Sequence, residues 1–115
     1  MSVELNQAES HAITGLRILD CTGRMGGYCG LLLANLGAEV ILIEPPGGDP
    51  ARNEGPFKDD IPNPDASLPF AAYQTNKRGI VLDLESDADR ETLRGLIRHA
   101  DVMIEDRPVG FWQRL

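Results

Sequence analysis

The sequence predicts an α/β domain whose core is a Rossmann-like, doubly wound parallel β-sheet. Two apolar runs, at residues 40–43 and 80–84, lack the regular alternation with polar residues that marks a half-exposed strand. Helix-forming stretches and a long loop separate these runs from two further short strands. The resulting order β-α-β-loop-β-α-β is typical of a parallel sheet, because parallel neighbours need long crossover connections.

The chain is expected to begin its domain with a strand, a turn and a helix. Residues 16–19 form the first expected strand, which ends at Asp20. A glycine-rich turn at residues 23–30 then leads into a helix that extends to about residue 36. Gly37 is well placed to end this helix, because glycine adopts the left-handed conformation at little cost.

Residues 45–69 differ in composition from the rest of the chain. Seven of the eight prolines lie there. Proline fixes φ and removes a backbone donor, so we expect neither a central strand nor a long helix in this segment. A connection of this length within a domain is usually either functional or mobile.

The clearest helix in the sequence begins after Ser86, whose hydroxyl can cap the first turn. The i, i+3, i+4, i+7 spacing gives this helix one apolar face, made by Leu93, Leu96, Ile97 and Ala100. We expect a fourth strand at residues 102–104 and the start of another helix within residues 109–115.

Composition and charge limit the classes of function. The 115 residues are 42% hydrophobic and 25% charged, as in one soluble domain. A net charge of −7 argues against a nucleic-acid binder, which presents basic surface to phosphates. The longest apolar runs, among them residues 31–34, are too short to span a membrane. No signal peptide is recognisable, so we expect a cytoplasmic protein.

Residues 1–14 are polar and unpatterned, and we interpret them as a flexible leader to a domain at residues 15–115. Cys21 and Cys29 lack the C-x-x-C spacing of redox or zinc sites, so we expect buried, reduced thiols. His11 and His99 are isolated from any nucleophile, and metal-ligand spacing is missing. The sequence therefore nominates neither a catalytic triad nor a metal site.

The glycine-rich turn raises the alternative of a small NAD-type domain. Backbone N–H groups of such a turn can approach a phosphate at a helix N-terminus. Glu44 follows the turn at the distance of the acid that binds an NAD ribose. The glycine spacing, however, is G-x-x-G-G-x-x-G rather than G-x-G-x-x-G, which makes this the least favoured alternative.

A second possible anion site is the pair of adjacent cations at Lys77 and Arg78. Basic side chains beside a strand can attract a phosphate. Taken without other information, a solvated loop is the more frequent arrangement of such a pair.

The order and spacing of four phrases resemble the N-terminal end of type III (CaiB/BaiF) coenzyme A transferases. The phrases are GLRILD at 15–20, LGAEVILIEPPGGDP at 36–50, NKRGIVLDL at 76–84 and ADVMIED at 100–106. The resemblance covers residues 15–115 and implies an incomplete, N-terminal part of a larger CoA-transferase fold. Members of the family move coenzyme A from an acyl-CoA to a free carboxylic acid, typically as interlocked dimers. The resemblance therefore implies coenzyme A, no metal, and a homodimer or hetero-oligomer.

The resemblance also assigns roles to residues of this chain. The family's catalytic aspartate forms a mixed anhydride and lies downstream of the matching segment, so no residue here is nominated as nucleophile. Among the implied coenzyme A contacts, Arg114 is the best single candidate, because a guanidinium can clasp phosphate oxygens bidentately. The implied contact positions are Met25, Gly26, Leu82, Glu85, Asp106 and Arg114.

The chain departs from the family pattern at positions that should face the cofactor. The family's Glu-Asn-Phe-Arg-Pro-Gly is EDRPVG at residues 105–110, and Glu85 stands where relatives often have lysine. Glu85 and Asp106 add negative charge near a polyanionic cofactor, which weakens binding. Two hypotheses remain open. The chain is either a part or subunit of a CoA transferase that contributes to CoA binding, or a degenerate, non-catalytic module that partners a catalytic chain.

Overall fold

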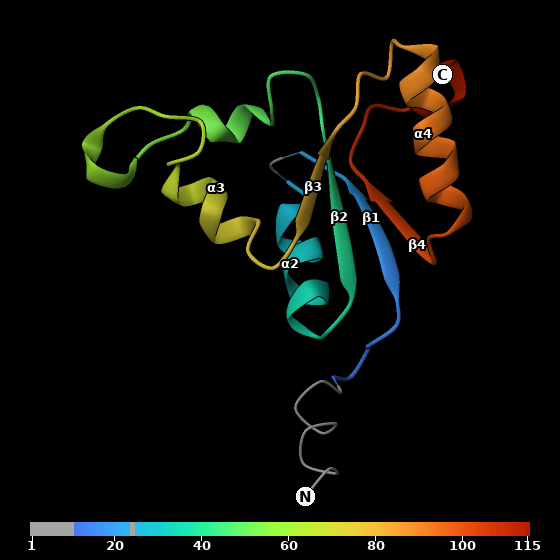
Figure 1. Cartoon of the computed structure of the whole chain (residues 1–115), viewed down its shortest axis with the longest axis horizontal. Helices are drawn as coiled ribbons and strands as arrows, with labels where there is room; N and C mark the ends of the chain where they lie inside the picture. Colours follow the sequence, from blue (N-terminus) through green and yellow to red (C-terminus); the bar gives the residue numbers. More distant parts are fainter. Residues whose placement is uncertain (1–10, 24) are drawn as a thin grey trace, which may run out of the picture.

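The computed structural model describes residues 11–23 and 25–115, which form one parallel β-sheet with helices on both faces (Figure 1). The strand order is β3-β2-β1-β4, and every neighbouring pair is parallel. The predicted fold class, a parallel α/β sheet, is therefore confirmed. The strands of the described residues are β1 (Arg17–Cys21), β2 (Glu39–Glu44), β3 (Arg78–Val81) and β4 (Val102–Glu105).

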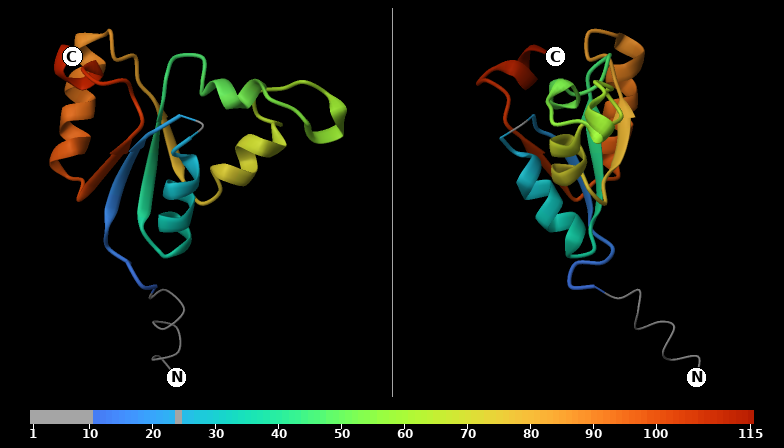
Figure 2. Two further views of the ribbon diagram at one scale, coloured as in Figure 1. Left: turned by 180° about the vertical axis from the view of Figure 1, so that it is seen from behind. Right: turned by 90° about the vertical axis from the view of Figure 1, so that its left-hand side faces the viewer.

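Two helices cover opposite faces of the sheet. The right-hand view of Figure 2 shows α2 on one side of the strands and α4 on the other. The described helices are α2 (Gly27–Asn35), α3 (Leu68–Tyr73), α4 (Asp87–Arg98) and α5 (Phe111–Arg114), with short 3₁₀ turns η1 (Pro50–Asn53) and η2 (Lys58–Asp60). The crossover from β1 through α2 to β2 and that from β3 through α4 to β4 therefore wind around the sheet on different sides.

Each face of the sheet has its own hydrophobic cluster. On the α4 side, Leu93 packs with Leu19 and Ile43, and Leu96 and Ala100 lie against this cluster. On the α2 side, Ala34 packs with buried residues of β1 and β2. Strands β1 and β2 contribute to both clusters, which explains why their sequences are continuously apolar.

The ends of the two covering helices follow the predicted chemistry. Ser86 caps α4, because its Oγ accepts a hydrogen bond from the Asp89 backbone N–H. Gly37 follows α2 with φ of 105°, the left-handed conformation that ends a helix. Of the predicted apolar face of α4, Ile97 is the exception, since it is 42% exposed.

The third strand starts and ends earlier than predicted. It covers Arg78–Val81 rather than residues 80–84. Leu82 still donates a backbone hydrogen bond to Glu44, but the N–H of Asp83 donates to the Asp89 carboxylate of α4. The chain therefore leaves the sheet at residue 83, because the Asp83 N–H bonds to a side chain in the first turn of α4 and not to a neighbouring strand.

The proline-rich connection after β2 is ordered around one arginine. Arg52 donates from Nε and Nη2 to the Glu44 carboxylate, at 2.7 Å for each bond. Its guanidinium also lies 4.1 Å from the centre of the Phe70 ring. Ser67 joins the two sides of the loop, since its Oγ donates to carbonyl oxygens of Ala51 and Glu54. Figure 1 shows this segment extending from the edge of the sheet.

Two sequence expectations concern the beginning of the chain and the cysteines. Residues 1–10 of the expected flexible leader lie outside the described residues, whereas Ile13 packs against the α2-side cluster. Cys21 is buried as expected, but the expectation is wrong for Cys29, which is exposed. Cys29 lies on α2, whose buried side is formed by Gly27, Gly30 and Ala34. Cys29 is on the other side of this helix, which faces solvent. In the described part of the chain, no helix is long and apolar enough to cross a membrane.

Candidate functional site

A cavity of about 240 Å³ lies where strands β2 and β3 end and α5 begins. The carboxyl ends of parallel strands are where ligands bind in open α/β sheets. Its lining is mostly apolar and includes four charged residues. The apolar walls are Ile43, Pro45, Pro46, Leu82, Leu84 and Phe111, and the charged residues are Glu44, Asp83, Glu85 and Arg107.

Two of the three cavity carboxylates already have partners. Glu44 is only 4% exposed, and its hydrogen bonds from Arg52 hold the pKa of this carboxyl below its usual value of 4.5. Asp83 accepts a hydrogen bond from the Glu85 backbone N–H at 3.0 Å. The Glu85 carboxylate has no hydrogen-bonding partner among the residues that the structure describes. It is therefore the carboxylate of this cavity that can accept hydrogen bonds from a ligand.

The wall contributed by α5 is held in place by Glu105. This carboxylate accepts hydrogen bonds from the Arg107 backbone N–H at 2.8 Å and from Trp112 Nε1 at 3.0 Å. Trp112 meets the Phe111 ring edge-on, with ring centres 5.0 Å apart. The Arg107 guanidinium lies 5.5 Å from the centre of the same Phe111 ring. Arg107 and Phe111 are thus positioned together in the lining of the cavity.

The glycine-rich turn after β1 is occupied by a carboxylate of the protein itself. Asp106 accepts hydrogen bonds from the Gly23 N–H at 2.9 and 3.0 Å and from the Gly26 N–H at 3.3 Å. Successive backbone N–H groups at the start of a helix form an anion-binding site. In this chain the anion is Asp106, which follows β4, the other neighbour of β1 in the sheet.

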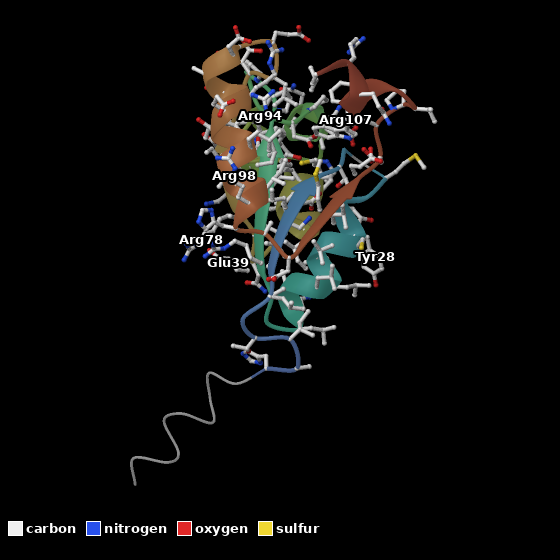
Figure 3. All side chains as sticks on the ribbon, turned by 90° about the vertical axis from the view of Figure 1, so that its right-hand side faces the viewer. Tyr28, Glu39, Arg78, Arg94, Arg98 and Arg107 are labelled. Atoms are coloured by element: carbon white, nitrogen blue, oxygen red, sulfur yellow. The ribbon has the colours of Figure 1, made fainter. Side chains whose placement is uncertain are left out.

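The two expectations for Lys77 are both wrong. Its side chain is 1% exposed, and Nζ lies 2.7 Å from the carboxylate of the fully buried Asp20. Lys77 is therefore neither a solvated loop residue nor a cation open to a phosphate. Its neighbour Arg78 is exposed and pairs with Glu39 at 3.4 Å, at the opposite end of the sheet from the cavity (Figure 3).

The structure brings two of the predicted contact residues, Leu82 and Glu85, into the cavity. Gly26 and Asp106 meet at the glycine-rich turn. Met25 lies beside them and is 91% exposed. The sixth residue, Arg114, lies at the end of α5 with its guanidinium 5.6 Å from the Phe111 ring, and it does not line the cavity.

Sequence reasoning missed Arg107 and Phe111 as parts of the cavity. A signal was present, because Arg107 stands where the family phrase has phenylalanine. The walls formed by Pro45 and Pro46 had no comparable signal, since prolines in a loop do not indicate which way the chain turns.

The residues that suggested an NAD-type site are engaged in internal contacts. Glu44 binds Arg52 through both carboxylate oxygens and accepts the Asp49 N–H at 3.0 Å. The donors of the glycine turn are directed at Asp106. Neither the ribose-binding acid nor the pyrophosphate-binding turn of that alternative is free.

No three His, Cys, Asp or Glu side chains within residues 11–23 and 25–115 group closely enough to hold a metal ion. The buried Cys21 thiol is also unsuited to nucleophilic chemistry. Burial raises its pKa to about 12, with a further contribution from the neighbouring Asp20 carboxylate. The thiol is therefore protonated at neutral pH.

Known CoA transferases match this chain over most of its length. Succinyl-CoA:(R)-benzylsuccinate CoA-transferase subunit BbsE of Thauera aromatica is 43% identical over 95 residues, which are 83% of this chain and 23% of that protein. Succinyl-CoA:mesaconate CoA-transferase of Haloarcula hispanica is 38% identical over 104 residues, covering 90% of this chain and 26% of the relative. The chain thus spans about a quarter of the length of these relatives.

Solved structures show the same fold. A CAIB/BAIF family protein from Brucella suis superposes with a TM-score of 0.80 at 30% identity, over 90% of this chain and 28% of that one. A hypothetical protein from Mycobacterium tuberculosis gives the same TM-score at 28% identity, over 91% of this chain and 28% of that one. The family model described as CoA-transferase family III matches residues 13–115. The chain belongs to CoA-transferase family III.

Proposed function

We propose that this chain forms one wall of the coenzyme A site of a CoA transferase that moves coenzyme A from an acyl-CoA to a carboxylic acid. The observation that carries the proposal is the cavity at the ends of β2 and β3. Leu82 and Glu85, nominated as coenzyme A contacts from the family resemblance, both line it. Family membership supports handling of acyl-CoA, and the cavity supplies a place for part of that molecule.

The cavity fits the nucleotide end of coenzyme A better than the whole molecule. Its volume of about 240 Å³ is below the range of pockets that enclose a complete drug-sized ligand. Its apolar walls suit the faces of a nucleobase, and the Glu85 carboxylate can accept hydrogen bonds from an amino group or from hydroxyls. The remaining walls of the site, and the catalytic aspartate, belong to protein outside this segment.

The chain is proposed to act within a larger assembly. The BbsE relative is described as a subunit, which supports either a homodimer or a hetero-oligomer with a chain that carries the nucleophile. Succinyl-CoA is the donor named for both relatives and is therefore the first acyl-CoA to test.

A titration with succinyl-CoA and acetyl-CoA tests the proposal. The single tryptophan, Trp112, contacts the cavity-lining Phe111, so its fluorescence should report binding. We expect saturable binding that free coenzyme A displaces and that pantetheine, which lacks the nucleotide, displaces poorly. Absence of saturable binding, with and without a catalytic partner chain, would remove the proposed function.

A second candidate is a structural module that partners a catalytic chain without binding coenzyme A. It is favoured by one observation, the Asp106 carboxylate that fills the glycine-rich turn. Native mass spectrometry distinguishes the two candidates. The structural module predicts a stable complex without bound coenzyme A, whereas the leading proposal predicts a complex that retains it.

A further inference from the structure

The guanidinium of Arg107 lines the cavity without a counter-ion. Its Nε is buried and has no hydrogen-bond partner in the described part of the chain. No ion pair formed between described residues includes Arg107. A buried cationic donor without a partner is costly, so such a group is rarely left unpaired unless something else binds it.

The neighbouring acids of the same loop are committed elsewhere. Glu105 accepts from the Arg107 backbone N–H and from Trp112, and Asp106 accepts from the glycine-rich turn. The nearby Cys21 thiol is neutral at pH 7 because burial raises its pKa to about 12. These groups therefore leave the Arg107 guanidinium free for an external anion.

The position of Arg107 is fixed before any ligand arrives. Its backbone is bonded to Glu105, and its guanidinium stands against the Phe111 ring. Figure 3 shows Arg107 beside α5, at the end of the molecule where the strands finish. A cation held in place in this way loses little conformational entropy when it binds an anion.

The cavity also presents a free carboxylate, that of Glu85. A ligand that satisfies both groups must carry an anion at one end and hydrogen-bond donors at the other. A nucleoside phosphate has this distribution, with phosphate oxygens for a guanidinium and ribose hydroxyls or an amino group for a carboxylate.

We propose that Arg107 binds a phosphate group of the nucleotide that enters this cavity. The inference rests on the proposed function and extends it, because the family phrase has phenylalanine at this position and so supplies no such contact. It also differs from the nucleotide-binding arrangement in which the glycine turn holds the phosphates, since Asp106 occupies that turn.

Isothermal titration calorimetry of the full chain tests the proposal with coenzyme A, dephospho-CoA, ADP and pantetheine. In R107M we expect about 10- to 100-fold weaker binding of coenzyme A, the usual effect of losing charge-assisted hydrogen bonds. Pantetheine binding should not change. If the affected group is the 3′-phosphate, wild-type protein and R107M will bind dephospho-CoA and ADP alike. If it is the pyrophosphate, dephospho-CoA and ADP will lose affinity as coenzyme A does.

Matched variants separate this contact from general charge effects. R98M removes the same charge from an exposed arginine on the outer face of α4 and should leave all affinities unchanged (Figure 3). R107K keeps the charge and should retain part of the affinity, and circular dichroism confirms that each variant is folded.

Two results would overturn the inference about Arg107 without contradicting the proposed function. Equal affinity of R107M and wild-type protein for coenzyme A and ADP would show that Arg107 binds no phosphate, although coenzyme A still binds. Loss of affinity in R114M and not in R107M would give the role to the other arginine of this region. If wild-type protein binds ADP through Arg107 but no acyl-CoA, the inference stands and the proposed function fails. Binding of neither ligand removes both.

Discussion

Lys77 Nζ lies 2.7 Å from Asp20 Oδ2, and both side chains are withdrawn from solvent. The same Nζ donates to the Gly27 carbonyl at 2.8 Å and to Gln74 Oε1 at 2.6 Å, so its three protons are all used. This one ammonium group therefore joins the end of β1, the start of α2 and the turn that follows α3.

We expect K77M to destabilise the protein strongly, because it leaves the Asp20 carboxylate buried without its counter-ion. Removing one partner of a buried pair typically costs about 3–5 kcal/mol. Urea unfolding of wild-type protein and K77M measures the loss. The double variant D20N/K77M, which removes both charges, should recover part of it. A loss below about 1 kcal/mol in K77M would instead indicate that water solvates the pair.

Gly30 should be required for the same ion pair. A Cβ at this position would lie 2.4 Å from Asp20 Oδ2 and 2.8 Å from Lys77 Nζ. We therefore expect G30A to cost about 1–3 kcal/mol, as overpacking usually does. G95A in α4 is the matched control, because its methyl group would meet nothing within 4 Å beyond its chain neighbours and the nearby backbone of its own helix. It should stabilise the protein by up to about 1 kcal/mol through helix propensity. Equal effects of the two changes in thermal unfolding would contradict this account.

The Glu44–Arg52 pair should contribute to the dependence of stability on pH. Hydrogen bonds from Arg52 lower the pKa of Glu44 in the folded protein. A lowered folded pKa gives stability that is present above the unfolded value of 4.5 and is lost as the pH falls through the folded value. The difference in unfolding free energy between wild-type protein and R52M should thus be largest near neutral pH and shrink below about pH 4.5.

Arg78 provides the control for this measurement. Its pairing with Glu39 is solvent-exposed, with 80% of the Arg78 side chain accessible, so R78M should change stability little at any pH. Urea unfolding at several pH values between about 3 and 7 compares the variants. A wild-type–R52M difference that stays constant over this range would show that Arg52 does not stabilise ionised Glu44.

The elements that the sequence predicted best are those with local signals. The cap at Ser86 and the left-handed Gly37 mark helix ends through chemistry within a few residues, and the structure places both as expected. The third strand was misplaced because its apolar run continues past the sheet. Leu82 and Leu84 pack as part of the α4-side cluster, although they lie in the turn after β3.

The site was less predictable because its partners are far apart in sequence. Asp20 and Lys77 are 57 residues apart, and Gly23 and Asp106 are 83 apart. The sequence shows which of these residues are charged, but only the strand order brings each pair together. The family resemblance named Leu82 and Glu85 as coenzyme A contacts, and the structure places both in the cavity lining. It did not name Arg107, whose buried Nε without a hydrogen-bond partner is a property of the folded chain.

The Asp106 carboxylate should be replaceable by a small external anion. In D106A the Gly23 and Gly26 N–H groups lose their acceptor but remain at the start of α2, where the helix dipole favours negative charge. We expect added phosphate or formate to raise the melting temperature of D106A and to shift the amide resonances of Gly23 and Gly26. Wild-type protein should show neither response, because Asp106 already occupies the turn.

D101A is the matched control for this experiment. Asp101 also accepts a backbone hydrogen bond, from the Arg17 N–H at 2.8 Å. This N–H group is at the start of β1 and does not belong to the glycine-rich turn. Its loss should not create a response to phosphate at Gly23 or Gly26, when ionic strength is kept constant with chloride. Identical shifts in wild-type protein and D106A would show that the turn is open to anions while Asp106 is present. No shift in folded D106A would contradict the prediction. It would show that the glycine-rich turn keeps its shape without Asp106 and does not bind an external anion.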